Sequence, residues 1–255
     1  MRPDRSRFSI SGNGVLAYGA GSGTAHLLWF DRTGKQAGSL GPPGLYVDFR
    51  ISPDGGKVAA QRADGLGGAD VWLLELARGT SSRLTFRSTY NLGPVWSPDG
   101  SRIRFTSIRE RWEIYEKVSS GGGDDTPLLM KTKNDLVTED WSPDGKSFLY
   151  GEIDPKPQTD LWILPGVSTT GEPARPTAFV RTEFDENFAR FSPDGKWVAY
   201  QSNESGRYEI YVRPFHPEGA GAGSGRSPPP AASNQDGRER APRFSTSGLT
   251  ICSWP

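Results

Sequence analysis

The sequence has little of the chemistry that most metal and catalytic sites need. Its 255 residues include one cysteine, Cys252, and two histidines, His26 and His216. A single thiol excludes a disulfide framework and a multi-thiolate metal site. Two histidines are a poor basis for a zinc centre, which takes three or four protein ligands. We therefore expect no metal and no other cofactor.

Net charge and long apolar runs are also missing. The 30 basic side chains balance 30 acidic ones, whereas nucleic-acid-binding domains usually carry a basic excess. No apolar run approaches the roughly 20 residues that cross a bilayer, and Met1–Arg7 does not lead into the apolar stretch of a signal peptide. We expect no nucleic-acid partner and no membrane insertion by this chain. Taken literally, the sequence predicts a cytoplasmic location. If the chain is a fragment of a membrane-tethered protein, the prediction is an extracytoplasmic location.

Turn-forming residues are in excess. Gly and Pro number 32 and 21, roughly double ordinary usage. One motif organises them: Ser-Pro-Asp-Gly occurs four times, at spacings of 45, 45 and 50 residues, with degenerate copies at Ser11–Gly14 and Ser245–Gly248. A period of about 40–50 residues indicates a propeller or another repeat array. The four copies are Ser52–Gly55, Ser97–Gly100, Ser142–Gly145 and Ser192–Gly195.

Each repeat has the same order of features. An alternating stretch follows the motif, then an acidic-apolar-aromatic triplet such as Asp70-Val71-Trp72, and then a short stretch that is clearest at Ser82–Thr85. Period-2 alternation without a helical pattern predicts four short strands per repeat. The predicted fold is an all-β propeller in residues 1–218, with five complete blades, a partial sixth and a ring that this chain does not close. Tryptophans at blade positions are predicted to pack between blades: Trp29, Trp72, Trp96, Trp141, Trp162 and Trp197.

The motif is predicted to form a turn between the first two strands of a blade. Ser bonds nearby backbone, Pro fixes φ and Gly accepts a positive φ. Four aspartates in one register also suggest a cation-binding ring, but we favour the turn because each Asp belongs to its own hairpin. The turn residues are Asp54, Gly55, Asp99, Gly100, Asp144, Gly145, Asp194 and Gly195.

The aromatic-Ser-Pro-Asp-Gly-Lys pattern, as in Trp141–Lys146, resembles the TolB-type, WD-repeat-like β-propeller repeat over about residues 8–217. A closer likeness is to the propeller that follows a membrane-tethered bacterial serine/threonine kinase. That resemblance implies a sensing or docking domain; the sequence contains no kinase catalytic signature. The closer likeness is carried by Gly14–Tyr18, Leu28–Lys35, Asp160–Pro165, Thr182–Asp185 and Tyr208–Phe215.

No catalytic motif is present. There is no Gly-x-Ser-x-Gly elbow, and Gly19–Gly23 lacks the ending of a phosphate-binding loop, so we expect no enzymatic activity. Arg and aromatic side chains are enriched at binding hot spots. Two loops between second and third strands are therefore candidate partner-binding sites, although ordinary solvated loops are the alternative. Their residues are Arg109, Arg111 and Trp112 in one loop, and Arg207 and Tyr208 in the other.

These observations favour a protein- or peptide-binding or sensing propeller, which the resemblance associates with a kinase. Two alternatives stay open: an accessory propeller of a prolyl-oligopeptidase-type hydrolase, and a TolB-like periplasmic scaffold. An unclosed ring also predicts self-association through an open blade edge.

Residues 219–255 differ from the repeats because they are rich in Gly, Pro and Ser. A flexible linker is one interpretation, and translation in a shifted frame is another. Codons shifted from Gly223 onward permit Lys-Trp-Gln-Val, Pro-Arg-Trp and Glu-Leu-Phe-Tyr, in the order in which the resembling propellers continue. The frame-shift interpretation predicts a one-base shift near codons 217–223, an upstream kinase and a downstream final blade, whereas the linker interpretation predicts an intact frame. Nucleotide sequencing across codons 215–255 and their surroundings checks this, and an intact frame would contradict the frame-shift interpretation.

Overall fold

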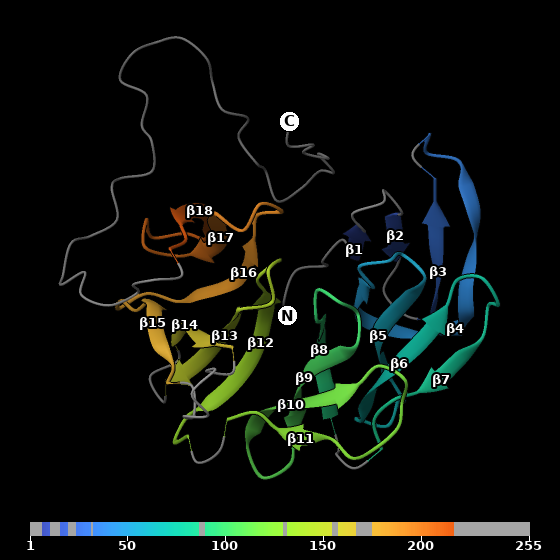
Figure 1. Cartoon of the computed structure of the whole chain (residues 1–255), viewed down its shortest axis with the longest axis horizontal. Coiled ribbons are helices and arrows are strands. Elements are labelled where there is room, and N and C mark those ends of the chain that lie inside the picture. The colour runs from blue at the N-terminus through green and yellow to red at the C-terminus, as the bar shows by residue number, and fades with distance from the viewer. Residues whose placement is uncertain are drawn as a thin grey trace. The chain divides into compact units, whose positions relative to one another are not determined.

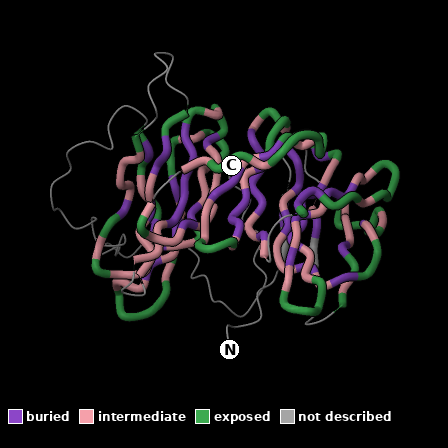
Figure 2. The backbone as a smooth tube through the Cα atoms, turned by 90° about the horizontal axis from the view of Figure 1, so that it is seen from below, coloured by how far each residue is buried: buried purple, intermediate pink, exposed green. Residues whose placement is uncertain are grey.

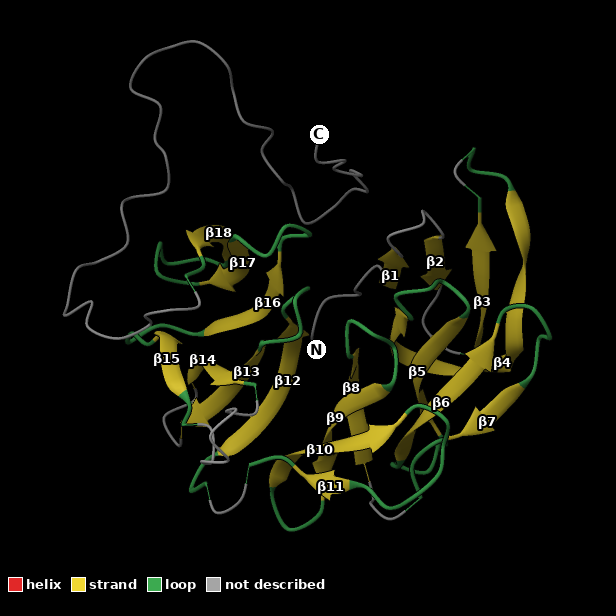
Figure 3. Cartoon of the chain, viewed as in Figure 1, coloured by secondary structure: helices red, strands yellow, loops and turns green. Residues whose placement is uncertain are grey.

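The described part of the chain is built only of β-strands. The structure is a computed structural model that describes residues 7–10, 16–19, 24–31, 33–86, 90–129, 132–154, 158–166 and 175–216. All of them belong to residues 1–221, the first of two units. Within these ranges there are eighteen strands and no helix (Figure 3). It follows that no described segment is a helix able to span a membrane.

The strands group into five consecutive antiparallel units, here called sheets. The first contains β1 (Arg7–Ile10), β2 (Leu16–Gly19), β3 (Ala25–Phe30) and the first half of β4 (Gln36–Ile51). The second contains the rest of β4 with β5 (Lys57–Ala63), β6 (Ala69–Glu75) and β7 (Ser81–Arg83). The third contains β8 (Tyr90–Trp96), β9 (Arg102–Ile108), β10 (Trp112–Val118) and β11 (Thr126–Pro127). The fourth contains β12 (Asp135–Trp141), β13 (Ser147–Asp154), β14 (Gln158–Pro165) and β15 (Thr177–Val180), and the fifth contains β16 (Glu186–Phe191), β17 (Trp197–Ser202) and β18 (Glu209–Pro214). The first three are joined edge to edge, because β4 is shared by the first and second and Ala69 of β6 pairs in parallel with Tyr90 of β8.

The sheets follow one another around an arc (Figure 1). The strands β1, β8, β12 and β16, with the second half of β4, lie toward its inner side and are called the inner strands; each contacts the next. β4 belongs to two sheets, since it pairs with β3 as far as Gly44 and with β5 from Leu45 onward. Hydrogen bonds between inner strands also join the sheets: the N–H of Ile51 donates to Ser9 Oγ (3.1 Å).

Each Ser-Pro-Asp-Gly motif forms the turn after an inner strand, and a serine hydroxyl holds it. Ser97 Oγ donates to Asp99 Oδ1 (2.6 Å) and accepts from the N–H of Arg102 (2.9 Å). The N–H of Ser101 donates to the same Asp99 oxygen (3.0 Å). The other three motifs repeat these bonds. The final glycine of each has a φ between 70° and 74°, which glycine adopts without strain.

Neighbouring turns also pack against one another. A methyl group added to the glycine of one turn would lie within 4.0 Å of the proline of the preceding turn. The motif therefore closes its own hairpin and also contributes to the contact between sheets. The glycine–proline pairs are Gly100 with Pro53, Gly145 with Pro98 and Gly195 with Pro143.

The hydrophobic core is divided into four clusters, one between each pair of consecutive sheets. Between the second and third sheets, Val71 and Leu73 of β6 pack with Trp96, Ile103 and Phe105. Buried segments accordingly occupy the middle of the strands, and the turns are exposed (Figure 2). The second, third and fourth sheets are thus each covered on both faces, which is how a propeller buries short strands.

The prediction of an all-β, repeat-built fold is confirmed. The blade count stays a prediction, because a fourth strand for the fifth sheet and any sixth blade would fall in residues 217–255, outside the described ranges. The expected packing of Trp197 between blades is wrong. Its side chain is 45% exposed because it lies on the face of the fifth sheet that no described sheet covers.

The serine hydroxyl predicts a testable difference between two exchanges to alanine. Ser97 is buried, so Ser97→Ala leaves the N–H of Arg102 without its acceptor and is expected to lower the free energy of unfolding by about 1–3 kcal/mol. Ser120→Ala changes an exposed position that follows β10 and is the control. It is expected to have little effect on the free energy of unfolding. Urea denaturation measures both variants, and equal stabilities would contradict the role assigned to Ser97.

Candidate functional site

The predicted contact residues of the third sheet lie in the turn between β9 and β10. The Arg109 guanidinium carbon lies 3.9 Å from the centroid of the Tyr115 ring. The N–H of Trp112 donates to Asp135 Oδ1 (3.2 Å), and Arg111 Nε lies 3.9 Å from the same oxygen. Because Asp135 begins β12, this turn is bonded to the next inner strand. The Arg111 side chain is nevertheless half exposed and accessible to a partner.

The contact residues of the fifth sheet lie in the turn between β17 and β18. Arg207 is 81% exposed at its side chain and pairs with Glu209 (2.6 Å). The Tyr208 hydroxyl donates to Asp185 Oδ2 (2.6 Å), one residue before β16. Both side chains therefore have local partners while facing solvent.

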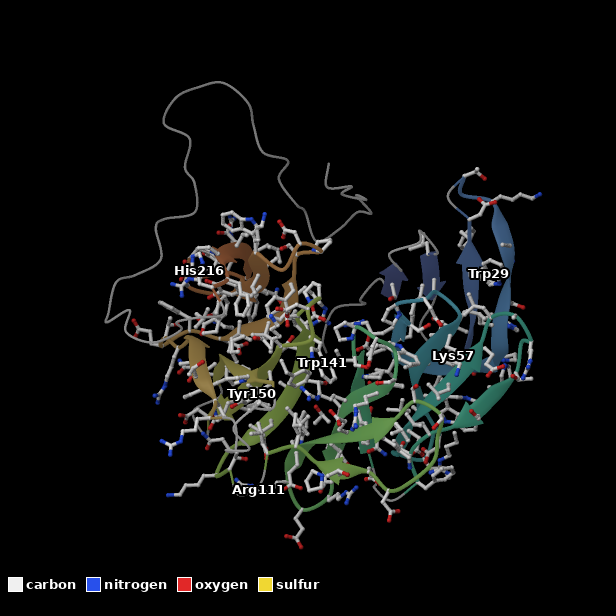
Figure 4. All side chains as sticks on the ribbon, viewed as in Figure 1. Trp29, Lys57, Arg111, Trp141, Tyr150 and His216 are labelled. Atoms are coloured by element: carbon white, nitrogen blue, oxygen red, sulfur yellow. The ribbon has the colours of Figure 1, made fainter. Side chains whose placement is uncertain are left out.

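These two groups are not brought together. Both follow the second strand of a sheet, so they lie at the same end of the strands, but the fourth sheet separates them. In Figure 4, Arg111 lies beside the start of β12, well apart from Trp141 at the end of that strand, so the loop residues lie at the strand end opposite to the turns. The five predicted contact residues form two separate points on one surface.

The four turn aspartates lie at the opposite end of the inner strands from these loops. The hydrogen bond from the Ser97 hydroxyl holds the pKa of Asp99 at about 2, and the equivalent bonds lower the pKa of the other three. Every one of these bonds stays within its own turn. Among the described residues no three Asp, Glu, His or Cys side chains form a group that could hold a metal.

A cluster of charged side chains lies near that same end of the inner strands, and the sequence analysis missed it. Asp48 and Arg50 come from β4, Glu139 and Asp140 from β12, and Arg190 from β16. Arg50 Nη1 lies 2.8 Å from Asp48 Oδ1, and Arg190 Nη1 lies 3.5 Å from Glu139 Oε2. We call these five residues the inner-strand charge cluster.

Burial controls the protonation of two members of the cluster. Glu139 is 5% exposed, and burial raises its pKa to about 8, although the N–H of Phe188 donates to Oε1 (3.2 Å) and the Arg50 charge opposes the rise. Burial likewise raises the pKa of Asp140 to about 6, despite a bond from the N–H of Phe191 (2.8 Å). Burial therefore favours the protonated form of both carboxyl groups, and more strongly for Glu139 than for Asp140.

Asp48, Arg50 and Arg190 are the accessible members of the cluster. Their side chains are 34%, 26% and 37% exposed, compared with 6% for Glu139. Arg190 also donates to the main-chain carbonyls of Glu139 and Ala189. Guanidinium groups offer paired N–H donors to a carboxylate. The cluster includes no hydroxyl or thiol nucleophile, so its arrangement is suited to binding charged groups.

One sequence signal marks the cluster. The repeats can be aligned on the motif serine. The third and second residues before that serine are Phe49-Arg50, Pro94-Val95 and Ala189-Arg190 in three repeats, but Glu139-Asp140 in the repeat of Ser142. An acidic pair on a strand that is otherwise mostly apolar is a departure that an alignment of the repeats exposes. Its neighbours across the arc cannot be found that way, because they come from strands far apart in the sequence.

No family model matches the sequence. The chain is 29% identical to Uncharacterized protein Atu1656 of Agrobacterium fabrum over 185 residues, which are 71% of this chain and 58% of that protein. It is 25% identical to Uncharacterized peptidase YuxL of Bacillus subtilis over 193 residues, 62% of this chain and 29% of that protein. The chain thus spans little more than half of the first relative and under a third of the second.

Solved structures share the fold. A putative TolB from Agrobacterium tumefaciens matches with a TM-score of 0.66 at 20% identity, over 82% of this chain and 76% of that one. TolB from Acinetobacter baumannii gives 0.62 at 21%, over 79% and 50%. A prolyl endopeptidase gives 0.58 at 16%, over 83% of this chain and 34% of the enzyme. The described part of the chain therefore has a TolB-like β-propeller fold, as the repeat predicted.

The raised pKa of Glu139 predicts how stability depends on pH. Its folded-state pKa, about 8, lies above the ordinary value near 4.3, so the protein loses stability as pH rises between these two values. Glu139→Gln keeps an acceptor for the N–H of Phe188 and does not ionise. We expect the free energy of unfolding to decline from pH 5 to 8 in the wild type and less steeply in this variant.

Urea denaturation at pH 5, 6, 7 and 8 measures this effect. Glu110→Gln, at an exposed position in the β9–β10 turn, is the matched control and should leave the slope unchanged. Parallel curves for the wild type and Glu139→Gln would show that burial does not perturb this carboxyl group.

Proposed function

We propose that this chain is a non-catalytic propeller module that binds a protein or peptide partner, and that the partner places a carboxylate at the inner-strand charge cluster. The observation that supports the proposal is the ion pair between the partly exposed Arg190 and the buried Glu139, with the charge of Arg50 acting on the same carboxyl group. Arg190 Nη1 lies 3.5 Å from Glu139 Oε2.

The electrostatics of the cluster favour an incoming carboxylate. Arg190 donates to two main-chain carbonyls, and burial favours the neutral form of its carboxyl partner Glu139. A carboxylate from a partner would accept two parallel N–H bonds from the Arg190 guanidinium. In a partly buried site such a charge-assisted contact contributes more than it would at the open surface.

A narrower form of the proposal is that the module senses or docks a ligand on behalf of a kinase. It is supported by the sequence likeness of the repeats to kinase-attached propellers. In this form Arg111 and Arg207, at the other end of the strands, provide a second contact surface.

The second candidate is an accessory propeller of a peptidase. It is favoured by the similarity to the peptidase YuxL and to a prolyl endopeptidase, of which the chain covers only 29% and 34%. The chemistry would then belong to a separate domain, and the bound peptide would be a substrate of that domain.

Selection from a displayed random-peptide library tests carboxylate binding. We expect enriched peptides to carry Asp, Glu or a free C-terminal carboxylate. The double exchange Arg50→Gln with Arg190→Gln is expected to weaken binding of a selected peptide at least about tenfold, equivalent to about 1.4 kcal/mol. Arg78→Gln removes an arginine that is 78% exposed at its side chain and serves as the control.

Three results would contradict the proposal. One is the absence of any enriched peptide, and another is equal binding by the wild type and the double variant. The third is cleavage of a selected peptide by the purified chain, because a non-catalytic module leaves its ligand intact.

A further inference from the structure

A buried glutamate with an unpartnered oxygen lies where the fifth sheet contacts the fourth. Glu186 begins β16, which contacts β14, and it is 0% exposed. Its Oε1 accepts hydrogen bonds from the hydroxyls of Thr182 (2.6 Å) and Ser202 (3.3 Å). Its Oε2 is also buried, and no group in the described part of the chain donates to it. A buried polar atom without a partner is costly, so native structures normally supply one.

A second unpartnered oxygen belongs to Asp160 of β14. Its Oδ1 is buried and has no partner among the described residues, while its Oδ2 lies 3.4 Å from Arg181 Nε. Burial raises the pKa of Glu186 to about 7, and the charges of Asp160 and Asp185 act in the same direction. Burial also raises the pKa of Asp160, and the Arg181 charge opposes this rise. Carboxylates that share a buried site repel one another, so one of them tends to keep its proton.

The equivalent contact between the second and third sheets pairs a carboxylate with an amide instead. Asn91 and Glu186 each lie six residues before the motif serine of their repeat, and Asp70 and Asp160 each begin an acidic-apolar-aromatic triplet. Asn91 Nδ2 donates to Asp70 Oδ1 (3.1 Å), so the amide supplies a hydrogen that a carboxylate lacks. A glutamate at this position can make the same bond only while it is protonated.

We propose that Glu186 keeps a proton at Oε2 and shares it with Asp160 Oδ1, and that loss of this proton opens the segment 181–185. This segment joins β15 to β16, and the N–H of Thr159 donates to Asp185 Oδ1 within it (3.0 Å). One proton gives both unpartnered oxygens a partner. Once both carboxyl groups are charged, their repulsion acts on the segment between their strands. The inference does not rest on the proposed function, because it concerns residues outside the inner-strand charge cluster.

The ionisable groups around the pair are mostly acidic, so repulsion grows as pH rises. Tyr200 of β17 stays neutral, because burial raises its pKa to about 12. Arg181 is 64% exposed at its side chain, so water screens its charge. The groups that act on the pair or on Tyr200 are Glu152 and Asp154 of β13, Arg181 and Asp185 of the segment, Glu204 of the β17–β18 turn and Arg213 of β18.

The direction of the pH effect follows from the two states of Glu186. Its pKa in the closed structure, about 7, lies above the ordinary value near 4.3 that opening restores. The segment therefore opens more readily as pH rises from about 4 to 7, with little further change above that range. The Tyr208 hydroxyl donates to Asp185 Oδ2 (2.6 Å). Opening thus also releases a residue that the sequence predicts to contact a partner.

Hydrogen exchange of the full chain, read by mass spectrometry at pH 5 and pH 7.5, tests the inference. After correction for the intrinsic pH dependence of exchange, residues 181–186 of the wild type are expected to be at least about tenfold less protected at pH 7.5. Glu186→Gln introduces the kind of amide donor that Asn91 provides, so its protection should be the same at both pH values. Glu183→Gln, at an exposed position of the same segment, is the control and should behave like the wild type.

The exchange Asn91→Glu makes the same test in the opposite direction. It places a carboxyl group beside Asp70 and is expected to give residues 81–86 a loss of protection at pH 7.5 that the wild type does not show there. If Asn91→Glu does not fold, the comparison of the wild type with Glu186→Gln decides alone.

Three results would overturn the inference. One is equal protection of residues 181–186 at the two pH values in the wild type, and another is an unchanged pH dependence in Glu186→Gln. The third is recovery of protection at pH 7.5 on addition of Ca²⁺ at about 1 mM, because a cation rather than a proton would then join the two carboxylates.

Discussion

The described sheets depend on packing against one another, face to face, in the order of the chain. A strand of six or seven residues cannot bury its side chains alone, and the four apolar clusters all lie between consecutive sheets. The same contact between sheets therefore recurs with each repeat. Val71 and Leu161 occupy the same place in it, and the turn prolines and glycines continue the contact at the strand ends. The fifth sheet is the place where the described chain stops satisfying this constraint.

The turns and strands could be predicted because their causes are local. The Ser97 hydroxyl bonds groups no more than five residues away, so the motif carries the whole geometry of the turn. The exposure of Trp197 was missed, although the repeats offer a signal for it. Five residues after the motif serine the earlier repeats have Lys57, Arg102 and Ser147, and Arg102 is exposed as well.

The candidate site was harder to predict because its causes are not local. Arg50 and Arg190 come from repeats 140 residues apart, and their common neighbour Glu139 becomes informative only once the inner strands lie together. Residue type alone pointed instead to the loops. There Arg109 and Tyr208 already have partners within the same fold, Tyr115 and Asp185. Side-chain chemistry identified residues able to bind, whereas the fold determined that Arg190 meets Glu139.

The long strand β4 has a mechanical consequence. Its sixteen residues pass from the first sheet into the second without an intervening turn, so the two sheets share one continuous backbone. A slip of one residue would reverse the inward and outward sides of both sheets at once. Among the described residues, the second and third sheets are joined edge to edge only by the pairing of Ala69 with Tyr90, whereas in β4 the backbone itself passes from one sheet to the other. The first two sheets therefore have to form, and yield to force, together.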